Sequence, residues 1–186
     1  VSAGTSVTVN ALPAQPTITS GSATTFCSGG SVTLSSSSSS GNLWSTSEST
    51  QDISVSATGV YTVQVTDVNG CVSPVSAGTS VTVNPLPTTS PISGSTTPPC
   101  SATGVTYNVT LTFGSSYSWS VPTDASITSG DTGPDNNSIT VDFGATNGDI
   151  SVVETNSNGC SASAVNLTIS LQGCGLNADF VADDTN

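Results

Sequence analysis

The side chains of this sequence that could do chemistry are five cysteines and twelve acidic residues. The chain has no Lys, Arg or His, so it offers no Ser-His-Asp or Cys-His arrangement, no Schiff-base lysine and no arginine to bind an oxyanion. Two carboxylates alone could serve a glycosidase, but the acidic residues are scattered and lie mostly in expected turns. We therefore predict that the chain is not an enzyme.

The cysteines predict one disulfide in each half of the chain. Cys71 and Cys160 each follow an Asn-Gly pair, and each has one other cysteine upstream, Cys27 or Cys100. Because the two couples are placed equivalently, we expect the disulfides Cys27–Cys71 and Cys100–Cys160, each worth about 4 kcal/mol, in an extracellular protein. Metal binding is the alternative, disfavoured by wide spacing and the lack of histidine. Cys174 is the odd cysteine, and we expect its partner beyond the end of the chain.

The sequence DTGPDNN contains three candidate calcium ligands, Asp131, Asp135 and Asn137. Oxygen ligands in a Gly- and Pro-containing loop suit Ca²⁺, a hard cation that takes six to eight oxygens. The alternative is a polar turn between strands, which the same residue types favour through their turn geometry. We expect no cofactor apart from this candidate calcium ion.

The elements that must position these residues are β-strands throughout. Short runs of Val, Ile, Thr and Tyr alternate with small polar residues, and Gly, Pro, Asn and Ser separate the runs. In the clearest run, Tyr61, Val63 and Val65 should point to one side of a strand. No stretch has sustained helical periodicity. The pattern predicts an all-β chain of β-sandwich domains.

A ten-residue repeat predicts the domain organisation. The sequence VSAGTSVTVN occupies residues 1–10 and again residues 75–84. This spacing exceeds the period of about 20–50 residues typical of solenoids, so each unit can hold its own core. We expect, in order, the last strand of a preceding domain (1–11), one complete sandwich (12–84), a second complete sandwich (85–171) and the start of a following domain (172–186). Prolines at the joints should stiffen an elongated array.

Three aromatic residues have positions typical of a sandwich core. Each expected domain contains one tryptophan, Trp44 or Trp119, and the two occupy equivalent positions. A tryptophan at this position of a sandwich usually fills the core. A sugar-stacking platform is the alternative for both. Tyr61 begins the strand that leads to the Asn-Gly-Cys motif, where a tyrosine can hydrogen bond to a nearby loop. Alignment of the two motifs also gives Glu154 an inward position, which is costly for a carboxylate, so we expect it at the rim of the sheet.

The formal net charge of −12 is all of one sign. A uniformly acidic surface repels phosphate backbones and anionic membranes, so we expect no nucleic-acid partner. No apolar run approaches the 18 or so residues that a membrane helix needs, so we expect no direct insertion into a membrane.

Several motifs give the chain a family resemblance. FCSGGSVTL (26–34), LWS (43–45) and GVYTVQVTDVNGC (59–71) resemble the immunoglobulin-like repeats of very large secreted surface proteins of the Bacteroidota. YSWSVP (117–122) and SITVDFG (138–144), followed by the second Asn-Gly-Cys, resemble the PKD-like repeats that accompany them, and NADFVAD (177–183) is similar to the opening of a PKD domain. Proteins built this way include gliding-motility adhesins and other type IX secretion cargo.

The resemblance implies that residues 1–11 end an immunoglobulin-like domain and that residues 12–84 form another. It also implies a PKD-like, immunoglobulin-like sandwich at 85–171 and the start of a PKD-like domain at 172–186. Its functional implication is a stalk or fibre segment of an adhesin on a bacterial cell surface. Its expected partners are neighbouring repeats of the same chain, with other copies of the fibre or surface glycans as further candidates. The alternative is a carbohydrate-binding accessory module of a secreted enzyme. Exposed aromatic side chains along one face of a sheet would favour this alternative over the stalk.

Overall fold

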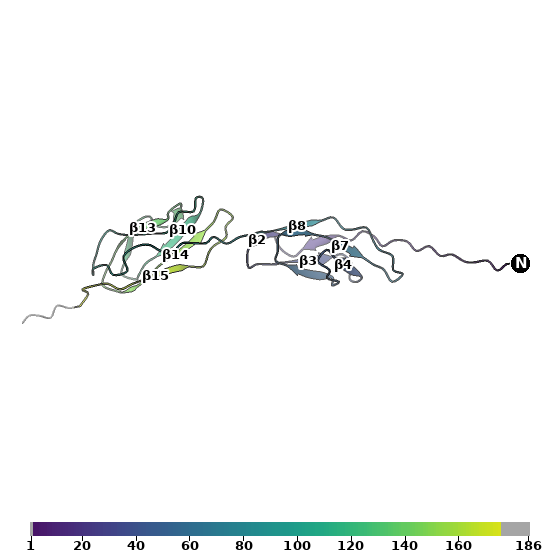
Figure 1. The fold of residues 1–186 in the computed structure, drawn as a ribbon, viewed down its shortest axis with the longest axis horizontal. Helices are drawn as coiled ribbons and strands as arrows, with labels where there is room; N and C mark the ends of the chain where they lie inside the picture. Colours follow the sequence, from purple (N-terminus) through teal and green to yellow (C-terminus); the bar gives the residue numbers. More distant parts are fainter. Residues whose placement is uncertain (1, 176–186) are drawn as a thin grey trace, which may run out of the picture. The chain divides into compact units, whose positions relative to one another are not determined.

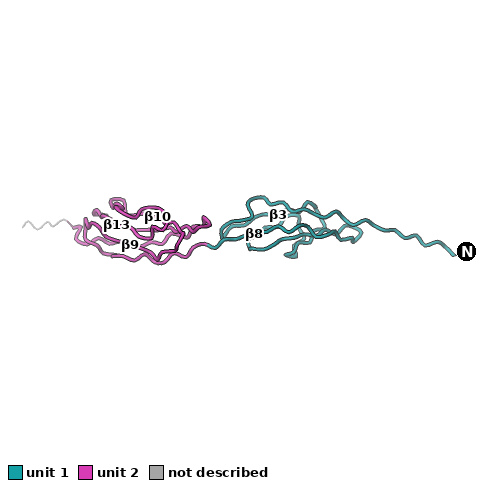
Figure 2. Tube along the Cα trace, turned by 90° about the horizontal axis from the view of Figure 1, so that it is seen from above, with its two compact units in different colours: residues 1–85 teal, residues 86–186 magenta. Residues whose placement is uncertain are grey.

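The computed structural model describes residues 2–175, which form two compact units, Val1–Pro85 and Leu86–Asn186 (Figure 2). The regular elements of this described part are all β-strands, and it contains no helix (Figure 1). The predicted all-β fold class is therefore confirmed. The predicted start of a following domain lies mostly outside the described residues, because residues 176–186 are not among them.

Unit 1 consists of three small sheets, ordered β1-β3-β5, β2-β8-β6 and β4-β7. All strand pairs are antiparallel except β2 with β8, which run parallel. The strands are β1 (Ile18–Ser20), β2 (Thr25–Cys27), β3 (Val32–Ser36), β4 (Asn42–Trp44), β5 (Asp52–Val55), β6 (Gly59–Tyr61), β7 (Val63–Val65) and β8 (Thr79–Asn84).

The core of unit 1 follows from strict alternation along its strands. In β3, Val32 and Leu34 are buried while Thr33 between them is exposed, because successive side chains of a strand point to opposite faces. The predicted inward side of residues 61–65 is confirmed, since Tyr61, Val63 and Val65 are all buried. The apolar cluster so formed contains Val32, Leu34, Trp44, Ile53, Val55, Tyr61, Val63 and Val81.

Unit 2 consists of two antiparallel sheets, ordered β12-β10-β14-β15 and β11-β13-β9. Its strands are β9 (Val105–Asn108), β10 (Ser116–Ser120), β11 (Ser126–Ser129), β12 (Gly133–Pro134), β13 (Ser138–Asp142), β14 (Gly148–Thr155) and β15 (Val165–Ile169). Alternate residues of both sheets meet in one core, as expected when two sheets pack face to face. The buried cluster is Ile92, Tyr107, Val109, Tyr117, Trp119, Ile139, Val141, Phe143, Ile150, Val152, Ile169 and Leu171.

Each unit brings the beginning of its chain beside its end. In unit 1 this is the parallel pairing of β2 with β8, in which Cys27 lies opposite Asn84. In unit 2 a short parallel bridge joins Pro99 to Gln172, whose carbonyl accepts a hydrogen bond from Cys100 N at 2.7 Å. These contacts are non-local, so they complete each sandwich only when the strands between them have folded.

A loop at one end of unit 2 is held by an aspartate. Asp124 Oδ2 accepts hydrogen bonds from the backbone N–H groups of Ala145 (2.7 Å) and Thr146 (2.9 Å). The bond from Ala145 is the main cause that holds the pKa of Asp124 below its usual value; burial opposes it, and the bonds from Thr146 act in the same direction as Ala145. The ionised carboxylate is thus favoured in the folded state.

We predict that Ile150→Ala lowers the free energy of unfolding of unit 2 by about 2–5 kcal/mol, because it leaves a cavity among fully buried side chains. Urea denaturation followed by tryptophan fluorescence measures the change. Phe113→Ala is the matched control: it removes a larger but exposed side chain and should change the stability by less than about 0.5 kcal/mol. Equal effects of the two substitutions would contradict this core.

We predict that Asp124 makes the stability of unit 2 fall on acidification. A pKa lowered by folding contributes stability above the unfolded value, near 3.8, and that contribution is lost as the pH falls through the folded value. In Asp124→Asn the decline of stability below pH 4 or so should therefore be shallower than in the parent chain. Denaturation curves at several pH values test this, with Asp149→Asn as a control that removes the same charge from an exposed strand position.

Candidate functional site

Cys71 and Cys160 occupy turns of the same construction, one in each unit. In unit 1, Asp67 Oδ1 accepts a hydrogen bond from Cys71 N at 2.8 Å. In unit 2, Asn156 Oδ1 accepts one from Cys160 N at 3.1 Å. Each turn is closed by one antiparallel bridge and by a backbone bond from its first residue to the carbonyl of its cysteine. The Asn-Gly-Cys motif therefore specifies a local turn, with an Asx side chain as its acceptor.

The predicted disulfide Cys100–Cys160 is wrong, because Cys100 bonds to Cys174. The Cα atoms of Cys100 and Cys174 are 5.1 Å apart, brought together by the parallel bridge of Pro99 with Gln172. Cys160 lies in the turn that joins β14 to β15, whereas Cys174 follows the other end of β15. The sequence signal that could have found this pair is the position of Cys174 directly after the last strand.

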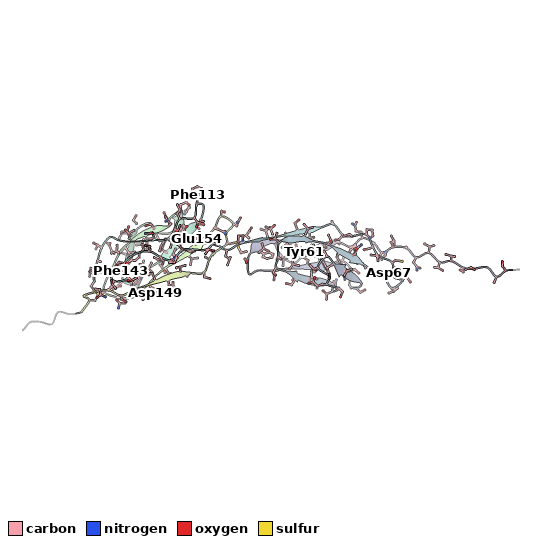
Figure 3. All side chains as sticks on the ribbon, viewed as in Figure 1. Tyr61, Asp67, Phe113, Phe143, Asp149 and Glu154 are labelled. Atoms are coloured by element: carbon pink, nitrogen blue, oxygen red, sulfur yellow. A yellow bond between two sulfur atoms is a disulfide. The ribbon has the colours of Figure 1, made fainter. Side chains whose placement is uncertain are left out.

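The predicted disulfide Cys27–Cys71 is also wrong, because Cys71 is free and partly exposed. Cys27 ends β2 opposite Asn84, the last residue of β8, whereas Cys71 precedes the start of β8. Figures 1 and 3 show β2 and Asp67, the first residue of the Cys71 turn, at opposite ends of unit 1. Cys27 and Cys160 are each disulfide-bonded.

Both tryptophans are buried and hydrogen bonded through their indole groups. Trp44 Nε1 donates to the carbonyl of Thr50 at 2.9 Å, and Trp119 Nε1 donates to the carbonyl of Asn136 at 3.0 Å. Their rings fill the cores of their own units. Neither ring is therefore presented to solvent as a surface on which a sugar could stack.

The tyrosines anchor loops to the core. Tyr61, labelled in Figure 3, donates from its hydroxyl to the carbonyl of Ala57 at 2.8 Å, four residues upstream. In unit 2, Tyr107 makes the corresponding kind of contact with the carbonyl of Ser95 at 2.7 Å, and burial raises the pKa of Tyr107. Analysis of the sequence alone did not single out Tyr107, which lacks a neighbouring motif like the one after Tyr61.

The candidate calcium ligands take part in separate turn contacts. Asp135 Oδ1 accepts a hydrogen bond from Gly114 N at 3.0 Å, and Asp131 Oδ1 accepts one from the hydroxyl of its neighbour Thr132. The amide of Asn137 donates to the carbonyl of Val109 at 2.6 Å. Residues 2–175 contain no group of three or more acidic or cysteine side chains placed to hold a metal ion. Calcium binding at this loop stays a prediction.

Glu154 is buried near the end of β14, with 1% of its surface exposed. Its Oε2 accepts a hydrogen bond from the hydroxyl of Thr89 at 3.0 Å. Its Oε1 has no hydrogen-bond partner among the described residues. The expected place near a strand end is correct, but the side chain is enclosed rather than solvated. In a chain without side-chain cations, Thr89 is the group that offsets part of the cost of this burial.

Candidate cavities and membrane segments add no further site. The described part of the chain has no ligand-sized cavity. Over the same residues, no helix has the length and apolar character needed to cross a membrane.

We predict that Thr89→Val lowers the free energy of unfolding by about 1–3 kcal/mol, because it removes the single donor that Glu154 has and keeps the carboxylate buried. Thr88→Val is the matched control, since Thr88 is exposed and should tolerate the same change within about 0.5 kcal/mol. Chemical denaturation of both variants gives the comparison. A Thr89→Val variant as stable as the control would show that this hydrogen bond contributes nothing.

Comparison with known proteins finds a family model that is similar to the second unit. The model of the PKD-like domain matches residues 85–169. No curated protein matches the chain. Among solved structures, the human OSCAR ligand-binding domain is similar, with 14% identity, a TM-score of 0.34, and coverage of 86% of this chain and 100% of that one.

Two further solved structures are similar to a comparable degree. The fibronectin(III)-like modules of Clostridium thermocellum CbhA have 12% identity and a TM-score of 0.36, over 83% of this chain and 94% of that one. The D00-D0 domain of intimin has 15% identity and a TM-score of 0.35, over 83% and 99%. At these values the solved structures carry no argument about function. The PKD-like family model thus matches the part of the chain that forms the two packed sheets of unit 2, and residues 85–169 are similar to a PKD-like domain.

Proposed function

We propose that the chain is a non-catalytic segment of the stalk or fibre of a large secreted bacterial adhesin. The observation that carries this proposal is the repeat of VSAGTSVTVN at residues 1–10 and 75–84. A repeat at the scale of a whole domain is typical of arrays of similar modules. Two units with separate cores support the same conclusion. In such an array the partners are neighbouring repeats, other copies of the fibre, or surface glycans.

The disulfides and the immunoglobulin-like, PKD-like fold are those of an extracellular domain. The bacterial surface, gliding motility and type IX secretion are finer proposals. They come from the resemblance of the motifs at residues 26–34, 59–71 and 138–144 to repeats of the Bacteroidota. Durability in that setting fits a sequence with no Lys or Arg, because trypsin-like proteases cleave after these residues.

The proposed mechanism is mechanical resistance. Parallel pairing of β2 with β8 joins the beginning and the end of unit 1, so a force applied along the chain shears several hydrogen bonds at once. In unit 2 the disulfide Cys100–Cys174 closes the same kind of junction covalently. A pulling force that enters near Cys100 and leaves near Cys174 passes through this bond, and the strands between the two cysteines are shielded from it.

A carbohydrate-binding module remains the alternative from the sequence, and the placement of aromatic residues does not favour it. Trp44, Trp119 and the three tyrosines are buried. Phe113 is the exposed aromatic side chain of unit 2, and it lies in the loop between β9 and β10 rather than along a sheet face (Figure 3). A row of stacking rings is therefore absent from the described strands.

We predict from the proposed stalk that small-angle scattering reports an elongated particle. A single compact globule of this length would have a radius of gyration of about 16 Å, and two sandwiches joined in line should exceed this value clearly. Size-exclusion chromatography coupled to scattering, at two ionic strengths, excludes aggregation and charge repulsion as causes. A radius of gyration near that of one globule would contradict the stalk.

A further inference from the structure

Cys71 lacks a partner within this chain although its turn is of a kind that bonds. All five cysteines lie among the described residues, and the other four are in disulfides. Cys160, which occupies the equivalent turn of unit 2, is one of those four. Any disulfide partner of Cys71 must therefore come from a polypeptide segment that this chain does not contain.

The N-terminal segment of unit 1 shows what that segment is. Residues 5–10 have the same sequence as β8. Strand β8 pairs with a neighbour on each side, β2 and β6, and its Val81 is 1% exposed. In residues 5–10 the equivalent valine, Val7, is 81% exposed, and Val9 is 89% exposed. An extended segment with exposed valines and unpaired backbone edges is covered when neighbouring strands pair with it. The same sequence in β8 shows that an immunoglobulin-like sheet provides them.

The register of β8 also gives the position of a cysteine beside this segment. Asn84, the last residue of β8, lies opposite Cys27, and its carbonyl accepts a hydrogen bond from Ser28 N at 2.8 Å. Asn10 is the counterpart of Asn84. In a domain that residues 5–10 complete, the residue at the Cys27 position therefore lies beside Asn10.

The geometry of unit 1 brings that position toward Cys71. The chain becomes buried at Pro16, six residues after Asn10, and six residues span at most about 20 Å. Gln15 Nε2 donates to the carbonyl of Val75 at 2.6 Å, four residues after Cys71 in sequence. The N-terminal segment thus leaves unit 1 at the end that carries the Cys71 turn, as Figures 1 and 3 show for the segment and Asp67.

The surface around the thiol fits a covered position. Val68, in the same turn, is fully exposed, and Val72 next to Cys71 is nearly half exposed. Apolar side chains at an exposed tip lose contact with water when a neighbouring domain packs against them, which is favourable.

We propose that Cys71 forms a disulfide with the cysteine at the Cys27 position of a neighbouring immunoglobulin-like domain, the one that residues 5–10 complete. This inference rests on the proposed array of repeats. In the reaction each thiol loses a proton, and formation of the S–S bond from the two thiols releases two electrons. A disulfide oxidant accepts both electrons and both protons and leaves as two thiols. The bond would join consecutive domains of the array covalently.

The test uses a longer chain built from this sequence. Residues 12–74 are placed directly before residue 1, so that residues 1–10 complete the added domain as residues 75–84 complete unit 1. The added copy of Cys71 carries Cys71→Ser, which leaves the added copy of Cys27 as its single thiol. The protein is folded with reduced and oxidised glutathione, denatured without reductant and alkylated with iodoacetamide. Intact mass then counts the alkylated thiols.

We expect no alkylated thiol in this chain, because the added copy of Cys27 and the original Cys71 have bonded to each other. The matched control adds Cys71→Ser in the original unit, and it should show one alkylated thiol, the added copy of Cys27. Two alkylated thiols in the test chain would overturn the proposal.

Two further outcomes separate this inference from the proposed function. If both thiols are free while the added domain unfolds cooperatively with the stability of unit 1, the covalent link is wrong and the array stands. If the added domain does not fold, residues 5–10 do not complete a domain, and both proposals fall. A third outcome would identify a second copy of the chain as the partner instead. In that case the unextended chain forms disulfide-linked dimers, Cys71→Ser abolishes them, and the longer chain has two free thiols.

Discussion

The parallel contact between the first and last segments of each unit is the constraint on which the rest of the structure depends. In unit 1 it joins β2 to β8, and in unit 2 it joins Pro99 to Gln172 and is closed by Cys100–Cys174. Bringing together segments so far apart in sequence costs loop entropy, and burial of the two apolar cores offsets this cost. Once the contact has formed, an early segment and the last segment of each unit are held side by side.

The absence of side-chain cations determines how the acidic residues are accommodated. No Lys, Arg or His is available for an ion pair, so carboxylates accept hydrogen bonds from backbone N–H groups, which carry partial positive charge. Four loops are held in this way, through the side chains of Asp67, Asp124, Asp135 and Asp142. The acidic residues are thus structural parts of turns, and they are dispersed rather than gathered into a site. Glu154 differs, since it is enclosed and has a threonine hydroxyl as its donor.

The two copies of VSAGTSVTVN show that strand formation in this chain requires neighbours as well as sequence. Residues 79–84 form β8 between two other strands, and the identical residues 5–10 form no strand in unit 1. Alternating valine and threonine favour an extended backbone, but an isolated strand has neither ladder hydrogen bonds nor a buried face to stabilise it. The proposed array and the proposed link through Cys71 both follow from this difference between identical segments.

The sequence by itself determined the fold class, the alternation of buried and exposed residues, and the local turns. Tyr61, Val63 and Val65 are buried as their period-two spacing predicts, because alternation is a local property of an extended chain. The turns at Cys71 and Cys160 are likewise specified by neighbouring residues. Only the tertiary structure decided which cysteines bond and that Glu154 is enclosed. Those outcomes depend on the parallel alignment of segments dozens of residues apart, and a local motif contains no information about which end of a strand lies beside another.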